Sequence, residues 1–243
     1  MVDSTLRARH ATWQEKPALR AVYTDLYKRI AAACRPGLSL EIGGGSGNFR
    51  EFSREVISTD IVPEPWLDAA ADAQSLPFRD ASFANIVGVD VLHHIERPRR
   101  FFLEAQRVLQ LGGRIILVEP AITPLSWVFY RLFHPEPVTL RSDPLEDGPL
   151  DPNRAPFDAN QAIPTLLLGR YRARMMEEFP SLVMADPEWM SFLAYPLSGG
   201  FRRWSLIPSV LVKTLLDLER SVPSWIGEWI AFRLMAVIEK ADR

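Results

Sequence analysis

The sequence contains a single cysteine, Cys34, so it can form neither an internal disulfide nor a metal site built from several cysteines. Its N-terminal residues lack the apolar core that a signal peptide has. It also lacks the run of about 18 apolar residues that a membrane-spanning helix needs. The nearest candidate, residues 222–238, is interrupted by Glu228 and Arg233. We therefore expect a cytoplasmic protein.

Neither sign of charge is in excess, because 28 Lys and Arg residues stand against 30 Asp and Glu residues, for a formal net charge of −2. Proteins that bind nucleic acid usually present a basic face, so we expect no nucleic-acid partner. The 243 residues, of which 47% are hydrophobic, suffice to build a full core. These values exclude a disordered chain and fit a globular protein.

Glycine is scarce and proline is abundant, with 13 and 20 residues respectively. Average usage is about 7% glycine and about 5% proline. Four of the 13 glycines fall within residues 43–47, and nine of the 20 prolines fall within residues 120–164. This distribution predicts a regular first part of the chain and an irregular second part.

Short apolar stretches alternate with stretches in which apolar residues recur at helical spacing. Such alternation predicts a parallel sheet with right-handed crossovers. The first part is expected to contain strands at residues 38–42, 56–61, 84–91 and 114–118, and helices at 17–33, 50–55, 63–71 and 97–109 with Gly112 and Gly113 as the last helix's cap. After Pro120 we expect helices at 126–133, 160–179 and 208–222, an irregular excursion at 134–156, and strands within 181–195 and at 231–239.

One strand runs directly into a cluster of glycines, Leu40-Glu41-Ile42-Gly43-Gly44-Gly45-Ser46-Gly47. Glycines let the backbone turn tightly and approach a ligand closely. The dinucleotide fingerprint fails, since Asn48 and Arg50 stand where its last glycine is required, and no Gly-Lys-Ser/Thr follows to make a P-loop. The turn is therefore not built primarily for a pyrophosphate or a triphosphate.

Acidic residues follow at positions that suit a nucleoside. Asp60 ends the second strand, where a carboxylate can accept both hydroxyls of a ribose. Asp72, followed by Ala73, could accept from the exocyclic amine of adenine, although Asp68 is a competing acid on the same segment. Glu41 would lie near a cationic part of the same ligand.

These segments resemble a class I S-adenosylmethionine-dependent methyltransferase, most similar to the small-molecule type-11 group that includes the ubiquinone and menaquinone methyltransferases. The resemblance covers about a third of the chain and rests on five blocks in order: LEIGGGSGNF, STDIVP, DAQSLPF, ANIVGVDVLHHIERP and RVLQLGGRIILVEP. It implies a Rossmann-like, seven-stranded, mostly parallel α/β sheet with helices on both faces and one antiparallel C-terminal strand. It also implies S-adenosylmethionine as the cofactor and S-adenosylhomocysteine as the product.

The resemblance assigns roles to individual residues. Glu41, Gly43 and Gly45 would hold the methionine part of the cofactor, Asp60 the ribose, and Asp72 with Ala73 the adenine. Val91, followed by Leu92 and His93, would lie beside the cofactor at the end of a strand. We expect one domain over residues 1–243, with the cofactor-binding core at residues 36–120 and helical insertions that cover the substrate at residues 121–230.

The adjacent histidines His93 and His94 are the candidate catalytic residues, because histidine is a natural general base near neutral pH. The alternative is that one packs at the strand end and the other only shapes the pocket. We expect no metal site, since neighbouring side chains point in different directions and no further His or Cys cluster follows.

The second part of the chain should determine the acceptor, and its aromatic residues favour a small, hydrophobic or lipid-linked molecule. The candidates are Trp127, Phe129, Tyr130, Phe133, Trp189, Phe192, Tyr195, Phe201 and Trp204. Residues 206–230 are apolar and include two tryptophans, so they could contact a membrane surface peripherally or form a homodimer interface. A non-catalytic S-adenosylmethionine-binding or scaffold protein is the alternative function, and Asn48 disfavours a Rossmann oxidoreductase.

Overall fold

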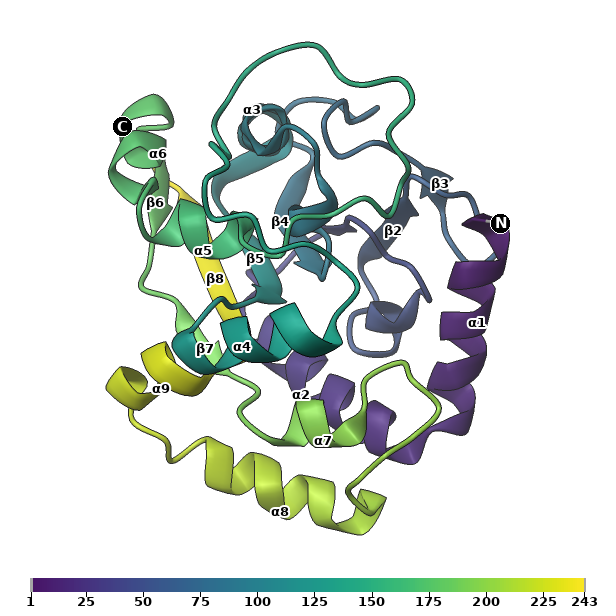
Figure 1. The fold of residues 1–243 in the computed structure, drawn as a ribbon. Coiled ribbons are helices and arrows are strands. Elements are labelled where there is room, and N and C mark those ends of the chain that lie inside the picture. Colours follow the sequence, from purple (N-terminus) through teal and green to yellow (C-terminus); the bar gives the residue numbers. More distant parts are fainter. Residues whose placement is uncertain (1, 243) are drawn as a thin grey trace.

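The structure is a computed structural model that describes residues 2–242, with side chains from Thr5 onward (Figure 1). Within these residues one mixed sheet has the strand order β3-β2-β1-β4-β5-β8-β6, and β7 pairs with β8 beside this path. The strands are β1 (Ser39–Glu41), β2 (Val56–Asp60), β3 (Ala69–Ala70), β4 (Phe83–Val89), β5 (Leu109–Pro120), β6 (Leu182–Met184), β7 (Glu188–Met190) and β8 (Arg233–Lys240).

The Rossmann-like arrangement predicted from the motifs is confirmed, including the single strand that runs against the others. β1 to β5 pair in parallel, and β8 is antiparallel to β5, β6 and β7. The described sheet has eight strands instead of the expected seven, because residues 181–195 pair with β8 in two pieces. Pro187 lies between the pieces and has no N–H to continue the pairing.

Helices pack on both faces of the sheet, as expected. The helices are α1 (Val2–Glu15), α2 (Pro17–Ala33), α3 (Pro98–Val108), α4 (Pro124–Phe133), α5 (Ile163–Leu168), α6 (Arg172–Glu178), α7 (Ala194–Ser198), α8 (Ser209–Glu219) and α9 (Ser224–Ile230), with 3-10 turns η1 (Asn48–Glu51) and η2 (Leu92–His94). Ile115 and Leu117 of β5 belong to a core with residues of α3, α5 and α6. Ile116 and Val118 belong to a second core with residues of α2, α7 and α8. Alternating side chains of one buried strand thus join the two cores.

Several local predictions are wrong. Residues 63–71 form no helix; the Asp68 carboxylate accepts from the Ser58 N–H at 2.8 Å and holds this segment along β2, where β3 pairs. The helix expected at 50–55 is the shorter turn η1. The helix α3 ends at Val108, and Gly112 and Gly113 lie within β5 instead of capping it. The helix predicted at 160–179 is divided into α5 and α6 on either side of Gly169.

Residues 134–162, which we call the excursion, connect α4 to α5 and form neither helix nor strand. Figure 1 shows this segment arching over α3. Ion pairs hold it there, including Arg99 with Asp147 at 3.0 Å and Arg174 with Asp143 at 2.6 Å, and Leu145 is buried in the core. The ion pairs of Asp143 and Asp147 and the buried side chain of Leu145 thus attach the excursion to the rest of the fold.

Across residues 2–242, no helix combines the length and the apolar character that crossing a bilayer would require.

Candidate functional site

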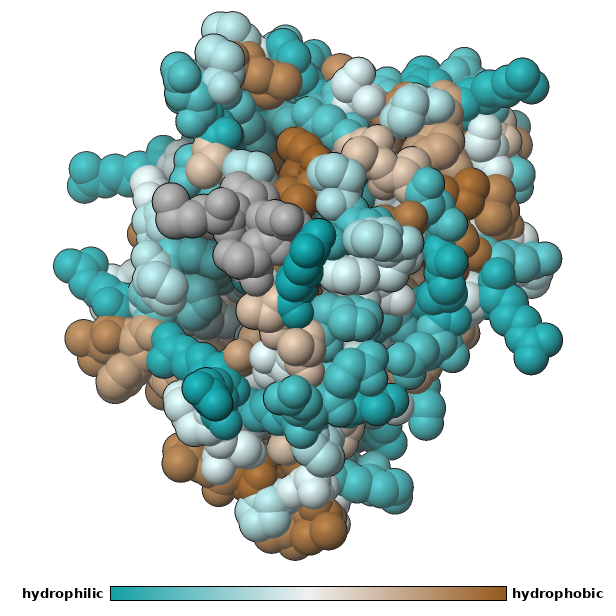
Figure 2. All heavy atoms as spheres, turned by 90° about the vertical axis from the view of Figure 1, so that its right-hand side faces the viewer, coloured by the Kyte–Doolittle hydropathy of each residue, from teal (hydrophilic) through white to brown (hydrophobic). Residues whose placement is uncertain are grey.

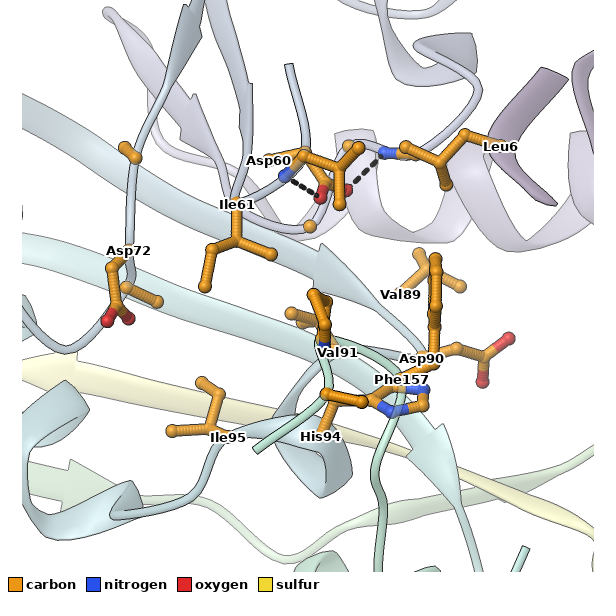
Figure 3. A pocket seen from close by; sticks show the side chains of 18 of the residues that line it. Leu6, Asp60, Ile61, Asp72, Val89, Asp90, Val91, His94, Ile95 and Phe157 are labelled. Carbon is orange, nitrogen blue, oxygen red and sulfur yellow. Dashed lines mark hydrogen bonds between the residues drawn. The ribbon is translucent and has the colours of Figure 1, made fainter. Parts of the chain in front are cut away.

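A pocket of about 260 Å³ opens at the carboxyl ends of β1, β2 and β4. Parallel sheets of this kind bind ligands at that edge. The pocket is lined by residues 43–46, 60–62, 71–74, 89–91, 94–96, 150–151 and 154–157, together with Leu6, Arg9, Tyr23, Tyr27 and Phe201. In Figure 3, Asp60 and Asp72 lie along one side of the pocket, and Val91, His94 and Ile95 lie along the other. Cofactor-binding candidates and one candidate catalytic histidine therefore share one cavity.

The glycine loop has a backbone that only glycine adopts without strain at its first position. Gly43 has φ +58°, in the left-handed region. A Cβ on Gly43 would lie 2.7 Å from the Cβ of Val91 and closer still to one of its methyl groups. The loop and the turn after β4 thus touch at Gly43, which brings Val91 to the cofactor side of the pocket, as the resemblance implies.

Asp60 binds the glycine loop to the end of β2. Its Oδ2 accepts from the Gly45 N–H and its Oδ1 from the Val62 N–H, both at 3.0 Å (Figure 3). Burial raises the pKa of this carboxyl, while these backbone hydrogen bonds oppose the rise. A carboxylate has about four lone-pair sites, so two remain for a ligand diol.

Asp72 and Asp68, the competing acids of the sequence analysis, are separated by the structure. Asp72 and Ala73 line the pocket. Asp72 is oriented by Gln74, whose backbone N–H donates to its Oδ1 at 2.9 Å. Asp68 is outside the lining and is engaged by the Ser58 N–H and by Arg50. The geometry therefore favours Asp72 as the adenine-side acid.

Glu41 lies beneath the glycine loop and does not line the pocket. It is buried, its carboxylate accepts from the Ser58 hydroxyl, and burial raises its pKa to about 7. A Cβ on Gly44 would come within 3.2 Å of its Oε2. For Glu41 to contact a ligand in the pocket directly, the glycine loop would have to shift. Glu41 can support the loop from below without any such change.

The two histidines of the turn η2 have different surroundings. His94 lines the pocket and His93 is buried behind it, although their ring centres are only 4.2 Å apart. The Nδ1 of His93 is 2.7 Å from Glu119 Oε2. Glu119 also accepts from the N–H groups of Val91 and Leu92, at 2.9 and 2.7 Å. Glu119 thus fixes the turn that carries both histidines.

These contacts push the two pKa values in opposite directions. Burial opposes a charge on His93, but Glu119 and Glu136 outweigh it and raise its pKa to about 9. Burial and the neighbouring His93 lower the pKa of His94 to about 4. At neutral pH the pocket therefore faces a neutral imidazole, and the charged member of the pair is turned away from it.

Glu119 and Glu136 are functional candidates that the sequence analysis missed. Glu119 lies near the carboxyl end of β5, as Glu41 and Asp60 lie at the carboxyl ends of β1 and β2, so the rule that singled out those two acids would have found it. Glu136 lies in the excursion, where its Oε2 approaches His93 Nε2 to 3.5 Å and accepts from the Gln161 side chain. No local pattern connects it to the histidines, because only the path of the excursion brings them together.

The aromatic residues proposed for the acceptor side lie mostly elsewhere. Of the nine named above, only Phe201 lines the pocket. Trp127, Phe133 and Trp204 are exposed on the surface, and the Tyr130 hydroxyl donates to the Phe232 carbonyl at 2.7 Å within the core. The pocket is instead closed by residues 150–157 of the excursion and by α1. The irregular backbone of the excursion carries no periodic signal that would have marked its individual lining residues.

A buried charged cluster supports the pocket at the end of β4. Asp90, which has φ +55°, lines the pocket, and its Oδ2 accepts from Arg233 Nη2 at 2.6 Å and from the Tyr23 hydroxyl at 3.1 Å. Arg233 is 2% exposed and its guanidinium carbon lies 4.0 Å from the centre of the Tyr195 ring. The cluster joins β8, α2 and the pocket wall.

The sheet order, the glycine loop and the acids at the end of β2 and after β3 match the arrangement of a class I S-adenosylmethionine-dependent methyltransferase, a class whose cofactor is S-adenosylmethionine. Residues 40–117 match the family model described as a methyltransferase domain. The family resemblance found in the motifs is thereby confirmed at the level of the class. The narrower likeness to ubiquinone and menaquinone methyltransferases stays a prediction.

Comparisons with known proteins give one relative in sequence and several in fold. An uncharacterized protein of Methanocaldococcus jannaschii is 36% identical over 104 residues, which cover 40% of this chain and 51% of that protein. The chain therefore spans about half the length of that relative. A S-adenosylmethionine-dependent methyltransferase from Archaeoglobus fulgidus shares the fold, with a TM-score of 0.53, 15% identity, and coverage of 91% of this chain and 94% of the other.

Two further structures show that the same fold serves different reactions. The cyclase SpnF has a TM-score of 0.53 and 16% identity, with 92% of this chain and 82% of the other covered. Geranyl diphosphate methyltransferase, solved in complex with S-adenosylmethionine, has a TM-score of 0.51 and 14% identity, with 91% and 85% covered. At such identities the likeness is one of fold, so the reaction must be argued from the site.

Proposed function

We propose that this protein transfers the methyl group of S-adenosylmethionine to a small, apolar or lipid-linked acceptor. The observation that carries the proposal is the shared cavity. It joins the glycine loop, Asp60 and Asp72 to His94 beneath the excursion. Cofactor-side and acceptor-side groups therefore face one another across a single space, as an in-line transfer between two bound molecules requires.

The chain itself would contribute positioning and the exclusion of water. Asp60 accepts the ribose hydroxyls, Asp72 and Ala73 meet the adenine, and Gly43 and Gly45 let the backbone pass close to the methionine part. Glu41 supports this loop from below. The cofactor supplies an activated methyl group, whose positive charge is lost on transfer, so an apolar wall formed by Val91 and Ile95 favours the reaction.

His94 is the acceptor-side residue in this proposal, because it alone of the pair lines the pocket. The free lone pair of its neutral imidazole can accept a hydrogen bond from a hydroxyl group or bind an electron-poor centre. His93 is a positioning residue, held by Glu119 at 2.7 Å and by Glu136. This division replaces the sequence-based hypothesis in which either histidine acts directly.

The proposed acceptor is apolar because of what surrounds the acceptor side. Phe157, Phe201, Leu150 and Leu6 line the pocket there, and the guanidinium carbon of Arg9 lies 5.5 Å from the centre of the Phe157 ring. A lining that combines these apolar side chains with two cations, Arg9 and Arg154, suits a hydrophobic molecule that carries a polar or anionic end. Geranyl diphosphate methyltransferase, which shares the fold, is named for an acceptor of this kind.

A membrane surface is the proposed source of such an acceptor. The segment that contains α8 and α9 leaves Leu206 72% exposed, Val210 81% exposed and Trp225 67% exposed. Apolar side chains also gather at the lower end of the molecule in Figure 2, the end at which α8 lies in Figure 1. Trp204, which is exposed, directly follows the exposed Arg202 and Arg203, so an apolar ring and two cations occur together, as suits a lipid headgroup layer.

Vesicle flotation tests this surface. The protein is expected to float with vesicles that contain anionic lipid. A variant that carries Leu206→Glu and Val210→Glu should remain in the dense fraction with unchanged affinity for S-adenosylhomocysteine, because neither residue lines the pocket. If the wild type stays in the dense fraction with anionic and with neutral vesicles, the membrane proposal is wrong. Dimerisation in that case would assign the patch to a second copy of the chain.

Calorimetry with S-adenosylhomocysteine tests the cofactor site. Replacing Asp60 with alanine should weaken binding by about 5- to 150-fold, which corresponds to the 1–3 kcal/mol lost when hydrogen-bonding groups are left unpaired. Asp68→Asn is the matched control, since Asp68 belongs to the same region without lining the pocket, and its affinity should be unchanged. Equal affinity of the Asp60→Ala variant and the wild type would remove the ribose assignment.

A second candidate function is binding of S-adenosylmethionine without methyl transfer. The cyclase SpnF shares this fold, so the fold alone does not require transfer. Incubation with methyl-labelled S-adenosylmethionine and a lipid extract separates the two functions. Label in an extracted lipid supports transfer, whereas tight binding with no label in any acceptor favours the second function.

A further inference from the structure

We propose that His93, His94 and Glu136 bind one divalent transition-metal ion of the zinc class at the wall of the pocket. One potential ligand atom from each of these residues lies within 4.8 Å of the other two. No metal site was expected from the sequence, because no further His or Cys cluster follows the histidine pair. The third ligand is a carboxylate that the excursion brings to the histidine pair.

The distances suit a metal ion better than a direct hydrogen bond. His93 Nε2 and Glu136 Oε2 are 3.5 Å apart. An N–H···O hydrogen bond usually measures about 2.7–3.2 Å. Tetrahedral zinc with ligand bonds of about 2.0–2.2 Å holds its donor atoms roughly 3.3–3.6 Å apart. An ion between these two atoms would therefore need little movement of either, and a ring nitrogen of His94 would be the third ligand.

His93 is already oriented as a metal ligand. Its Nδ1 is engaged by Glu119 at 2.7 Å, which leaves Nε2 directed toward Glu136. Metal-binding histidines almost always donate their second ring nitrogen to a carboxylate or a carbonyl in this manner. Glu119 is itself held by the N–H groups of Val91 and Leu92, so the imidazole has a fixed direction.

Gln161 supplies an independent sign that a ligand is expected here. It is 2% exposed, and its Nε2 donates to Glu136. Its Oε1 is buried and has no hydrogen-bond partner among the described residues. Such an orphaned acceptor is costly unless something donates to it. The amide that orients Glu136 thus carries an acceptor that the described residues leave unsatisfied.

The donor set selects the class of ion. Two imidazole nitrogens and one carboxylate oxygen suit zinc and its first-row neighbours, and they leave at least one coordination position open. The carboxylates of Glu119 and Glu136 supply two negative charges to balance a dication in a buried setting. Magnesium and calcium prefer oxygen ligands, so they fit this set less well.

The use of the ion rests on the proposed methyl transfer, whereas its binding does not. Because His94 lines the pocket, the open position faces the acceptor side. An acceptor hydroxyl bound there would release its proton to solvent, since a metal ion lowers the pKa of a bound hydroxyl. That oxygen then bonds to the methyl carbon as the carbon–sulfur bond breaks, and the electron pair stays on sulfur.

Cobalt titration of the full chain tests the site. The chelator-treated protein, without S-adenosylmethionine, should bind one Co²⁺ per chain with the visible absorption of a four- or five-coordinate nitrogen and oxygen site, and Zn²⁺ should displace it. Glu136→Gln and His94→Asn should each weaken binding at least tenfold. His10→Asn is the control, because His10 stacks on Trp66 at 4.5 Å outside the cluster and should bind as the wild type does.

Two results would overturn the site: no cobalt spectrum at stoichiometric concentration, or unchanged binding by both cluster variants when their thermal unfolding shows that they fold. Methyl transfer is measured separately with metal-free and zinc-loaded protein. Equal rates would reject the catalytic use of the ion and leave its binding in place. Failure of S-adenosylhomocysteine to bind would reject the proposed function without altering the cobalt result.

Discussion

Replacing Gly43 with alanine is expected to lower the free energy of unfolding by about 2–5 kcal/mol. A non-glycine residue in the left-handed region costs roughly 1–2 kcal/mol, and forcing an extra carbon into a packed site costs about 1–3 kcal/mol more. Both terms apply, because Gly43 has φ +58° and a Cβ would lie 2.7 Å from the Cβ of Val91. Urea denaturation would measure the loss.

The same substitution should weaken S-adenosylhomocysteine binding by at least tenfold, since the loop and Val91 must move apart and both line the pocket. Gly112→Ala is the matched control. Gly112 has φ +75°, and a Cβ there would meet nothing within 4 Å. The Gly112→Ala variant should therefore lose only the stability that corresponds to backbone strain, about 1–2 kcal/mol, and should keep its ligand affinity. If the two variants lose equal stability, close packing at Gly43 is not what the loop depends on.

Replacing Arg233 with methionine should destabilise the protein by about 3 kcal/mol. Breaking a buried ion pair leaves one charge without a partner and typically costs 3–5 kcal/mol. The lower value is expected here because the Asp90 side chain keeps 26% exposure, so water can partly solvate its carboxylate. The variant also loses the stacking of the guanidinium on Tyr195, for which methionine is only a partial substitute.

A double-mutant cycle isolates the charge effect in this cluster. Asp90→Asn combined with Arg233→Met removes both charges, so it should recover part of the stability lost in the Arg233→Met variant. Arg233→Lys should fall between the wild type and Arg233→Met, since it keeps the charge and loses the planar fork. Thermal unfolding is measured for the wild type, the two single variants of the cycle, the double variant and Arg233→Lys. If the double variant loses more stability than the two single variants lose together, packing dominates in this cluster and the ion pair does not.

The cofactor half of the pocket could be predicted from the sequence because its parts are close together along the chain. The glycine cluster and Asp72 each come after a strand and Asp60 ends one, and parallel strands end at one edge of a sheet. The structure brings these residues to one cavity, as their order implies. Glu41 is the exception: its position after a strand was visible, but only the structure shows that the glycine loop lies between it and the pocket.

The acceptor half could not be predicted in the same way. An aromatic side chain has the same sequence signature in a core, on a surface and in a pocket, so Phe201 could not be distinguished from the exposed Trp204. Phe157 in the excursion closes the cavity without lying on any periodic element. Ion pairs between distant segments, such as Arg99 with Asp147, determine the path of this irregular chain.

The sequence by itself indicated the class of the domain and its cofactor, and it predicted which residues would face that cofactor, because those depend on short-range order along successive strand ends. Only the tertiary structure decided how the histidine pair is used. The two rings lie only 4.2 Å apart, and which one enters the pocket depends on Glu119 from β5 and Glu136 from the excursion. Those contacts join segments that are far apart in the chain. Burial lowers the pKa of both imidazoles, but the two carboxylates outweigh it at His93 and raise that pKa.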